Sequence, residues 1–257
     1  MQDKTNQLKM GSCGMEQQRW ALVSGADRGL GLALAQGLLE RGYGVFAGLL
    51  QEKGDAHKEL ETAYNGRLRF LTLDIASATS VEQAYEQVQE ETGALDILVN
   101  NAAILGNISA TVEDELDFAE MEQVFSVNTL GSLRMSNRFV PLLMNSRDKL
   151  IVNISSEAGS IGDCWRNAWY AYCMSKAALN MQSKLIHNQL SPKGGRVMVV
   201  HPGHVKTFMQ GKLDAAGKLT PEESAGSILG LVDKRLAPDY AGEALTLLDY
   251  SGQVLPW

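Results

Sequence analysis

The sequence predicts an α/β fold, in which a parallel sheet carries helices on both faces. Short apolar runs alternate with helical patterns almost to the C-terminus, as in βαβ units. Most of these runs are continuously apolar, which is typical of strands buried on both sides. The chain has 257 residues, of which 45% are hydrophobic and 21% charged, so it can bury one sizeable core. We therefore expect a single α/β domain over residues 19–257.

Each expected strand is a short apolar run that ends at a turn residue or a polar segment. The seven runs are Trp20–Ser24, Val45–Leu50, Leu68–Asp74, Leu95–Asn100, Leu150–Ile154, Arg196–His201 and Ala244–Leu248. The intervals show helical apolar spacing, and the expected helices are Gly29–Arg41, Asp55–Tyr64, Ser80–Glu91, roughly Glu115–Met144, Trp169–Leu190 and Pro221–Asp233. Gly42 ends the first helix, and a Thr-Pro pair begins the last one.

Composition excludes several classes of protein. The net charge of −7 offers no basic surface for nucleic acid or anionic lipid. No apolar stretch reaches the ~18 residues of a membrane span, and residues 1–18 form a polar tail without the apolar core of a signal peptide. The three cysteines and four histidines show no disulfide or metal-ligand spacing. We expect a cytoplasmic protein with no metal, nucleic-acid partner or membrane contact.

A glycine-rich turn follows the first strand directly and opens the first helix. It covers residues 24–31 (SGADRGLG). Glycines allow the backbone to turn sharply and to approach a pyrophosphate at the helix N-terminus, although they could also simply join strand to helix. The position favours dinucleotide binding and therefore a Rossmann-type, doubly wound parallel sheet of about seven strands. Ligands of such sheets bind beyond the carboxyl ends of the strands.

Tyr172 and Lys176 form the strongest chemical signal. They lie four residues apart on a predicted helix, so both side chains point to one face. A phenol with a pKa of about 10 is a poor acid–base group at neutral pH, and a nearby ammonium lowers that pKa. The spacing suits a tyrosine proton donor, but it also occurs by chance in helices, so the surrounding motifs decide.

The motifs together resemble the short-chain dehydrogenase/reductase family, single-domain type. In chain order they are GxxxGxG at residues 25–31, Asp74-Ile75, NNAA at 100–103, NISS at 153–156, YCMSK at 172–176 and PGHVKT at 202–207. The resemblance runs from about Trp20 to the C-terminus, and the ending is similar to C-factor-like and sniffer-type carbonyl reductases. Ser24 stands where threonine is usual, and Ala103 stands where glycine is usual.

The resemblance implies four catalytic residues. Ser156 would orient the substrate oxygen, with Ser155 as the alternative, and Tyr172 would act as acid/base. Lys176 would bind the nicotinamide ribose and lower the pKa of the tyrosine. Asn128 would kink its helix and hold a water in a proton relay. The implied reaction is interconversion of a carbonyl and an alcohol by hydride transfer, with the cofactor supplying the hydride.

The resemblance also implies the cofactor contacts. They are Ser24, Gly25, Asp27, Arg28, Gly29, Leu30, Gly31, Asp74, Ile75, Asn101, Ala102, Ala103, Tyr172, Lys176, Pro202, Gly203, Val205 and Thr207. NADP(H) is favoured over NAD(H), because no acid ends the second strand and Arg28 is basic. A second basic residue that is usual after that strand is replaced by Leu49, unless Lys53 serves.

The substrate is less well defined. Candidate lining residues are Ile104, Trp165, Trp169, His204, Phe208 and Met209. Tyr172 follows Ser156 by 16 positions, more than is usual in the family, so residues 162–167 should form an enlarged loop over the site. The glycine-punctuated segment 208–219 is consistent with a mobile lid.

Two expectations concern partners and an alternative function. The family resemblance implies a homodimer or homotetramer that uses the two long helices, together with a small carbonyl or alcohol substrate. The alternative function is an NADP(H)-binding redox-sensing or signalling protein with little turnover. Tyrosine and lysine are often lost in such proteins, and both are present here.

Overall fold

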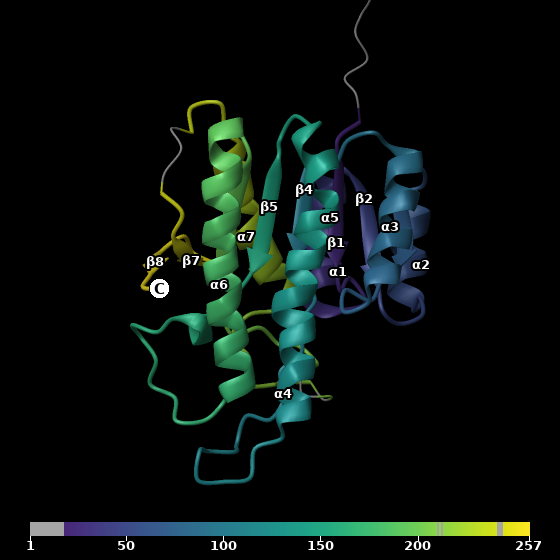
Figure 1. Cartoon of the computed structure of the whole chain (residues 1–257). Coiled ribbons are helices and arrows are strands. Elements are labelled where there is room, and N and C mark those ends of the chain that lie inside the picture. The colour runs from purple at the N-terminus through teal and green to yellow at the C-terminus, as the bar shows by residue number, and fades with distance from the viewer. Residues whose placement is uncertain (1–17, 210, 212, 241–243) are drawn as a thin grey trace, which may run out of the picture.

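A single mostly parallel sheet forms the centre of the computed structural model, which describes residues 18–209, 211, 213–240 and 244–257 (Figure 1). The expected N-terminal tail lies outside the described residues apart from Gln18. The strand order is β3-β2-β1-β4-β5-β6-β7-β8, with β8 antiparallel to β7 and all other neighbours parallel. The order reverses direction between β1 and β4, which confirms the doubly wound α/β fold.

The strands and helices alternate along the chain as predicted. The strands are β1 (Trp20–Ser24), β2 (Gly44–Leu49), β3 (Leu68–Thr72), β4 (Ile97–Asn100), β5 (Leu150–Ile154), β6 (Arg196–His201), β7 (Leu247–Asp249) and β8 (Val254–Leu255). The α-helices are α1 (Gly29–Glu40), α2 (Asp55–Ala63), α3 (Ala78–Glu91), α4 (Phe118–Phe125), α5 (Ser132–Met144), α6 (Tyr170–Leu190) and α7 (Pro221–Leu236).

Helices cover both faces of the sheet, and each face has its own apolar core. Leu34 and Leu38 of α1 and Ile228 of α7 pack on one face. Tyr85 of α3 and Phe139 of α5 pack on the other, where α6 also lies (Figure 1). β1, β2, β4 and β5 are buried along their whole length, because helices exclude water from both of their faces.

The C-terminal edge of the sheet differs from the prediction. The last expected strand, Ala244–Leu248, is observed as Leu247–Asp249, because only these residues pair with β6. An eighth strand follows that the sequence pattern did not reveal, since two residues are too short for any periodicity. Asp249 closes this hairpin by accepting hydrogen bonds from the backbone N–H groups of Ser251 and Gln253, both at 2.9 Å.

The expected long helix at about 115–144 is three segments rather than one. α4 begins at Phe118, where Asp117 caps it by accepting a bond from the Glu120 N–H at 3.0 Å. A π-helical segment, Ser126–Gly131, then joins α4 to α5. π-Helical turns are rare and are frequently found at functional sites. Among the described residues, no helix is both long enough and apolar enough to cross a membrane.

Candidate active site

The glycine-rich turn between β1 and α1 has a shape that favours glycine and that requires it at two positions, Gly25 and Gly31. Gly25 and Gly29 have positive φ angles of 66° and 55°. A Cβ on Gly31 would lie 2.0 Å from the Gly25 carbonyl oxygen, and one on Gly25 would lie 2.8 Å from the Cα of Ala102. These contacts press the turn against the loop that follows β4. The backbone there is therefore fixed by steric exclusion.

Ser24 holds the two loops together. Its hydroxyl accepts hydrogen bonds from the backbone N–H groups of Asn101 at 3.1 Å and Ala102 at 3.2 Å. The Asn101 amide in turn donates to the Ser24 and Gly25 carbonyl oxygens, both at 3.0 Å. Serine can make these bonds as well as the threonine that is usual at this position, because both supply the same hydroxyl.

The N-terminus of α1 is open toward the turn. Arg28 occupies the N-cap position in an extended conformation and makes no side-chain capping bond. Asp27 accepts a bond from the Gln51 N–H at 2.6 Å, which draws the end of β2 to the same place. Uncapped N–H groups and the helix dipole favour an anion. The cradle of glycines at this helix end therefore fits a dinucleotide pyrophosphate.

The end of β2 bears on the choice of cofactor. No carboxylate stands at the end of the strand or directly after it, where Leu49 is buried and Leu50 is exposed. Lys53, the alternative second basic residue, is paired with Glu61 at 3.2 Å. Arg28 instead lies over Phe208, with its guanidinium carbon 5.6 Å from the ring centroid. Of the two basic residues, Arg28 and Lys53, Arg28 is therefore the one that lies at the glycine-rich turn.

His57 supports the turn, and sequence reasoning missed it. This buried residue of α2 accepts the Gly54 N–H at Nδ1, at 2.9 Å. That bond places the ring proton on Nε2, which donates to the Ala26 carbonyl oxygen at 3.1 Å. No local pattern could have revealed this role, because Ala26 is 31 positions away.

The loops that follow β3 and β6 reach the same end of the sheet. Asp74 shapes its turn by accepting the Ala76 N–H at 2.9 Å, and Ile75 is buried beside it. After β6, Pro202-Gly203 leads to Thr207, whose methyl group would be 3.6 Å from a Cβ on Gly29. The structure therefore brings the predicted cofactor residues after β1, β4 and β6 together.

Ser156, Tyr172 and Lys176 meet where β5 faces α6. All three are buried. The Lys176 ammonium donates to the Ile154 carbonyl oxygen at 2.9 Å and lies 5.6 Å from the centroid of the Tyr172 ring. The two α6 side chains thus share one face, as their spacing predicts.

Burial dominates the electrostatics of this pair. It raises the pKa of Tyr172 to about 12, although a hydrogen bond with Ser156 acts to lower that pKa. Burial also lowers the pKa of Lys176 to about 8. The pKa of the tyrosine is therefore raised, whereas its spacing from the lysine led us to expect that it would be lowered. At neutral pH the phenol holds its proton and the lysine is charged.

Asn128 sits in the π-helical segment and connects it to two other elements. Its side chain accepts the Ile104 N–H at 2.9 Å and donates to the Ile104 carbonyl oxygen at 2.8 Å. It also donates to the Ser175 hydroxyl at 3.0 Å, next to Lys176 on α6. The helix departs from α geometry at Asn128, as the sequence resemblance implied.

The aromatic candidates for substrate contact are placed differently. Trp169 packs edge-on against Tyr172, with ring centroids 6.1 Å apart. Trp165 lies in the enlarged loop with 79% of its surface exposed. Phe208 and Met209, each 41% exposed, lie where the chain leaves the Thr207 turn. Only Trp169 among these four has a ring contact with the tyrosine.

The segment predicted to be a lid is tied at both ends. Val205 forms a β-bridge with Leu219, and the Lys206 N–H donates to the Leu219 carbonyl oxygen at 2.9 Å. His204, a candidate for substrate contact, is paired with Asp214 at 2.7 Å. Residues 210 and 212 of this segment lie outside the described residues.

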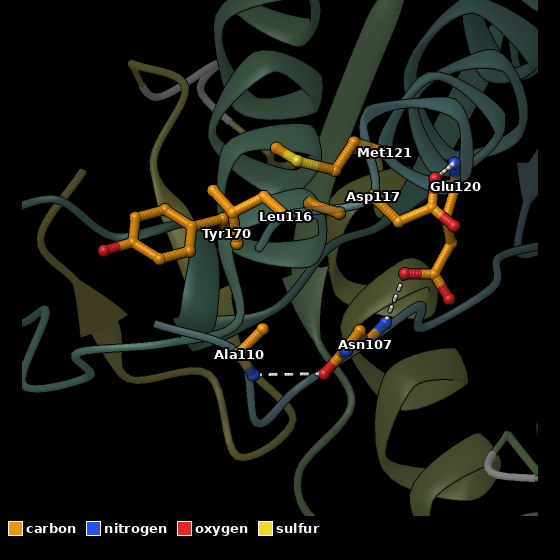
Figure 2. Close-up of a pocket in the computed structure, with 8 residues that line it drawn as sticks. Asn107, Ala110, Leu116, Asp117, Glu120, Met121 and Tyr170 are labelled. Atoms are coloured by element: carbon orange, nitrogen blue, oxygen red, sulfur yellow. Dashed lines mark hydrogen bonds between the residues drawn. The ribbon is translucent and has the colours of Figure 1, made fainter. Parts of the chain in front are cut away.

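A small hollow lies beside this region, between α4, the start of α6 and the loop at 107–117 (Figure 2). Its lining residues include Leu116, Met121 and Tyr170, and it offers about 20 Å³, which is room for one water molecule. Asn107 closes one side, where its backbone N–H donates to Glu120 at 2.9 Å (Figure 2). Tyr172 and Ser156 do not line this hollow.

Comparisons with known proteins agree with this geometry. The family model for short chain dehydrogenases matches residues 19–218. An uncharacterised oxidoreductase of Schizosaccharomyces pombe is 31% identical over 250 residues, covering 91% of this chain and 96% of its own. The C-signal protein of Myxococcus xanthus is 35% identical over 166 residues, covering 65% of this chain and 95% of its own.

Solved structures show the same fold. The NADPH-bound carbonyl reductase from chicken fatty liver superposes with a TM-score of 0.80 at 32% identity, covering 93% of this chain and 99% of that one. The carbonyl reductase Sniffer of D. melanogaster gives a TM-score of 0.79 at 25% identity, covering 93% and 100%. The resemblance to sniffer-type reductases inferred from the sequence is thus confirmed.

The fold and the site define a nicotinamide-dependent oxidoreductase that acts on hydroxyl and carbonyl groups. The chain belongs to the short-chain dehydrogenase family.

Proposed function

We propose that the protein reduces ketones or aldehydes with NADPH. The observation that carries the proposal is the buried Tyr172 phenol, whose pKa Ser156 acts to lower and whose ring centroid lies 5.6 Å from the Lys176 ammonium. The exposed apolar side chains Trp165, in the loop before α6, and Phe208 and Met209, after Thr207, favour an apolar substrate. Oxidation of the corresponding alcohol is the same reaction in reverse.

The site residues have distinct parts in this reaction. A bound nicotinamide supplies the hydride that the carbonyl carbon accepts. Ser156 and Tyr172 donate hydrogen bonds to the carbonyl oxygen, and Tyr172 transfers its proton as that oxygen gains negative charge. The charged Lys176 ammonium then stabilises the phenolate that remains. Because the phenol is protonated at neutral pH, the protein is ready to act in the reductive direction.

The preference for NADPH rests on Arg28 and on the missing acid after β2. A carboxylate there would repel a 2′-phosphate, whereas Arg28 at the glycine-rich turn can pair with one. The NADPH-bound carbonyl reductase that shares the fold is consistent with this choice.

The test combines cofactor binding with turnover. NADPH and NADH are titrated into the protein by fluorescence, and carbonyl compounds from small (diacetyl) to bulky (benzil) are assayed beside Tyr172→Phe. We expect tighter NADPH binding, and a loss of turnover of roughly a thousandfold in the variant with cofactor binding unchanged. Equal turnover by both proteins would refute the role of Tyr172, and tighter NADH binding would refute that of Arg28.

A second candidate is a signalling protein that binds the cofactor with little turnover. The observation that favours it is the similarity to the C-signal protein. The same titration separates the two, since a sensor would bind NADPH tightly and leave the whole carbonyl panel unreduced.

We propose further that the protein assembles as a homodimer or homotetramer through α5 and α6. Leu133 on α5 and Met181 and Leu185 on α6 are between 40% and 63% exposed, an apolar surface of the kind that marks interfaces. Both helices lie on the same face of the sheet (Figure 1). Sedimentation velocity should give at least twice the monomer mass of 28.0 kDa, and a monomer at micromolar concentration would refute the assembly.

A further inference from the structure

The enlarged loop before α6 is fastened by one ion pair. Arg166 binds Glu157 through both ends of its guanidinium, at 2.8 and 2.7 Å. The arginine side chain is only 9% exposed. The Glu157 side chain is 38% exposed, so the pair is half-buried, and its bidentate arginine–carboxylate geometry is specific. The pair therefore fixes where the loop lies relative to the end of β5, where Glu157 is located.

Two tryptophans continue the contacts of this ion pair, which we call the clamp, toward Tyr172, the predicted proton donor. The guanidinium carbon of Arg166 lies 4.5 Å from the Trp165 ring centroid and 4.9 Å from that of Trp169. Trp169 in turn packs edge-on against Tyr172. Glu157, Arg166, Trp169 and Tyr172 thus form one continuous line of contacts.

The backbone at Trp169 shows that this arrangement is held under strain. Trp169 has a φ angle of 68°, in the left-handed region, and it is the N-cap residue of α6. A bulky non-glycine residue rarely adopts this conformation, and it persists only where surrounding contacts fix it. Here the contacts are those with Arg166 and Tyr172.

The other end of the clamp reaches the predicted substrate-orienting serine. Glu157 follows Ser156 directly and begins a short 3₁₀ turn, Glu157–Gly159. The Ser156 hydroxyl caps that turn by accepting the Ala158 N–H at 3.1 Å. Ala158 also belongs to the small apolar cluster around Tyr172. A shift of Glu157 would therefore move the serine and one wall of the tyrosine pocket together.

We propose that the Glu157–Arg166 ion pair is a positioning device that sets the geometry of Ser156 and Tyr172 for proton transfer, by holding the enlarged loop and Trp169 against them. Neither residue needs to touch the substrate. The proposal rests on the reductase function proposed above, since it assigns the pair a part in that reaction. It explains why the arginine side chain is largely covered in a loop whose other residues, 161–165 and 167, are exposed.

Because Glu157 and Arg166 are charged, they affect the pKa of Tyr172 in a way that a purely packing role would not. The charged or titratable groups that act on the Tyr172 phenol are Glu157 and Cys173, which raise its pKa, and Arg166, which lowers it. Lys176 faces the same ring. Removing one member of the ion pair leaves the charge of the other uncompensated. The two single variants should therefore move the tyrosine pKa in opposite directions.

The test uses Arg166→Met and Glu157→Gln, which remove charge and hydrogen bonds but keep most of the side-chain volume. Arg166→Lys restores the charge without the planar fork. The matched control is Arg138→Met on α5, which breaks a similar bidentate pair with Glu82 that also stacks on an aromatic ring, Tyr85. Reduction of diacetyl and benzil, oxidation of the corresponding alcohols, and Tm are measured for each protein.

We expect kcat to fall at least roughly tenfold in the first two variants, as a small misplacement of reacting groups can cause, with NADPH affinity unchanged and partial recovery in Arg166→Lys. The pH at which alcohol oxidation is half-maximal should rise in Arg166→Met and fall in Glu157→Gln. Arg138→Met should lower Tm comparably without changing kcat or the pH profile. If all variants behave like Arg138→Met, the pair is merely structural and the proposal is wrong.

A second readout does not depend on turnover. Chymotrypsin cleaves after exposed tryptophans in mobile chain, and mass spectrometry locates the cuts. We expect cleavage after Trp165 and Trp169 to accelerate at least severalfold in Arg166→Met and Glu157→Gln, but not in Arg138→Met. Unchanged cleavage would overturn the clamp. If the wild-type protein binds NADPH but reduces nothing, the proposed reductase fails while this measurement still decides whether the pair holds the loop.

Discussion

The predicted site has two halves, the glycine-rich turn (first half) and the enlarged loop before α6 (second half), and their backbones are held in place in different ways. At the glycine-rich turn the backbone itself is the structure, because a Cβ on Gly31 would lie 2.0 Å from a carbonyl oxygen. At the enlarged loop the backbone is held by side chains, namely the Glu157–Arg166 pair and the ring of Trp169. The backbone of the first half packs so closely that no side chain fits at Gly25 or Gly31, whereas a few specific side-chain contacts hold the second half in place.

This difference matches what each half has to recognise. A dinucleotide pyrophosphate is the same in every enzyme that uses it, and it is bound by backbone N–H groups that no side chain needs to supply. A substrate differs between enzymes, so its walls are built from side chains that can change. Trp165, 79% exposed at the rim, can be replaced without disturbing the sheet beneath it.

The largest effect is expected from a substitution in the glycine-rich turn. Gly31→Ala should weaken NADPH binding at least a hundredfold, because the new methyl group overlaps the Gly25 carbonyl oxygen and the Asn101 amide, 2.6 Å away. We expect the free energy of unfolding to fall by about 1–3 kcal/mol, as overpacking typically costs. Fluorescence titration and urea unfolding measure the two effects.

The matched control is Gly226→Ala on α7, where nothing lies within 4 Å of the added methyl group. Replacing an exposed helical glycine with alanine should stabilise the fold by about 0.5–1 kcal/mol and leave cofactor binding unchanged. If Gly31→Ala folds and binds like this control, steric exclusion does not set the turn, and the contrast between the two halves disappears.

The sequence could predict the fold and the first half because both follow local rules. Continuous apolar runs marked the strands. Glycines at 25, 29 and 31 marked the turn, and at 25 and 31 a Cβ would clash with the backbone. The four residues predicted to be catalytic were found through ordered motifs, and Tyr172 and Lys176 do share one helical face. The sequence failed at β8, whose two residues show no pattern.

The contacts of the second half could not be predicted from the sequence, because only the fold brings the contacting residues close together. The spacing showed that the loop before Tyr172 is enlarged, but nothing in it showed that Arg166 binds Glu157. The same is true of His57 and the Ala26 carbonyl oxygen. The pKa of Tyr172 was expected to be lowered by Lys176, and burial, which no local pattern reports, raises it instead.

A smaller effect is expected at Lys176, where one substitution should reduce turnover and yet raise the free energy of unfolding. This buried ammonium has its pKa lowered to about 8, so folding opposes its charge at neutral pH. Lys176→Met removes that charge, but it also leaves the Ile154 carbonyl oxygen without its donor. We expect turnover to be lost, while the free energy of unfolding at pH 7 rises by a net ~1–2 kcal/mol.

The sign of the pH dependence makes this prediction specific. The folded-state pKa of Lys176 lies below the ordinary lysine value of 10.5, so between about pH 8 and pH 10.5 the unfolded wild-type chain binds more protons than the folded one. Wild-type stability should therefore rise through that window. The advantage of Lys176→Met should shrink and then reverse, because the variant still lacks the hydrogen bond to the Ile154 carbonyl oxygen. Lys184→Met, on the same helix but only half-buried, is the control. Urea unfolding at pH 7 and pH 10 measures both variants. A constant difference between Lys176→Met and the wild type at the two pH values would show that folding leaves the pKa of Lys176 unshifted, and that burial does not oppose the charge of this ammonium.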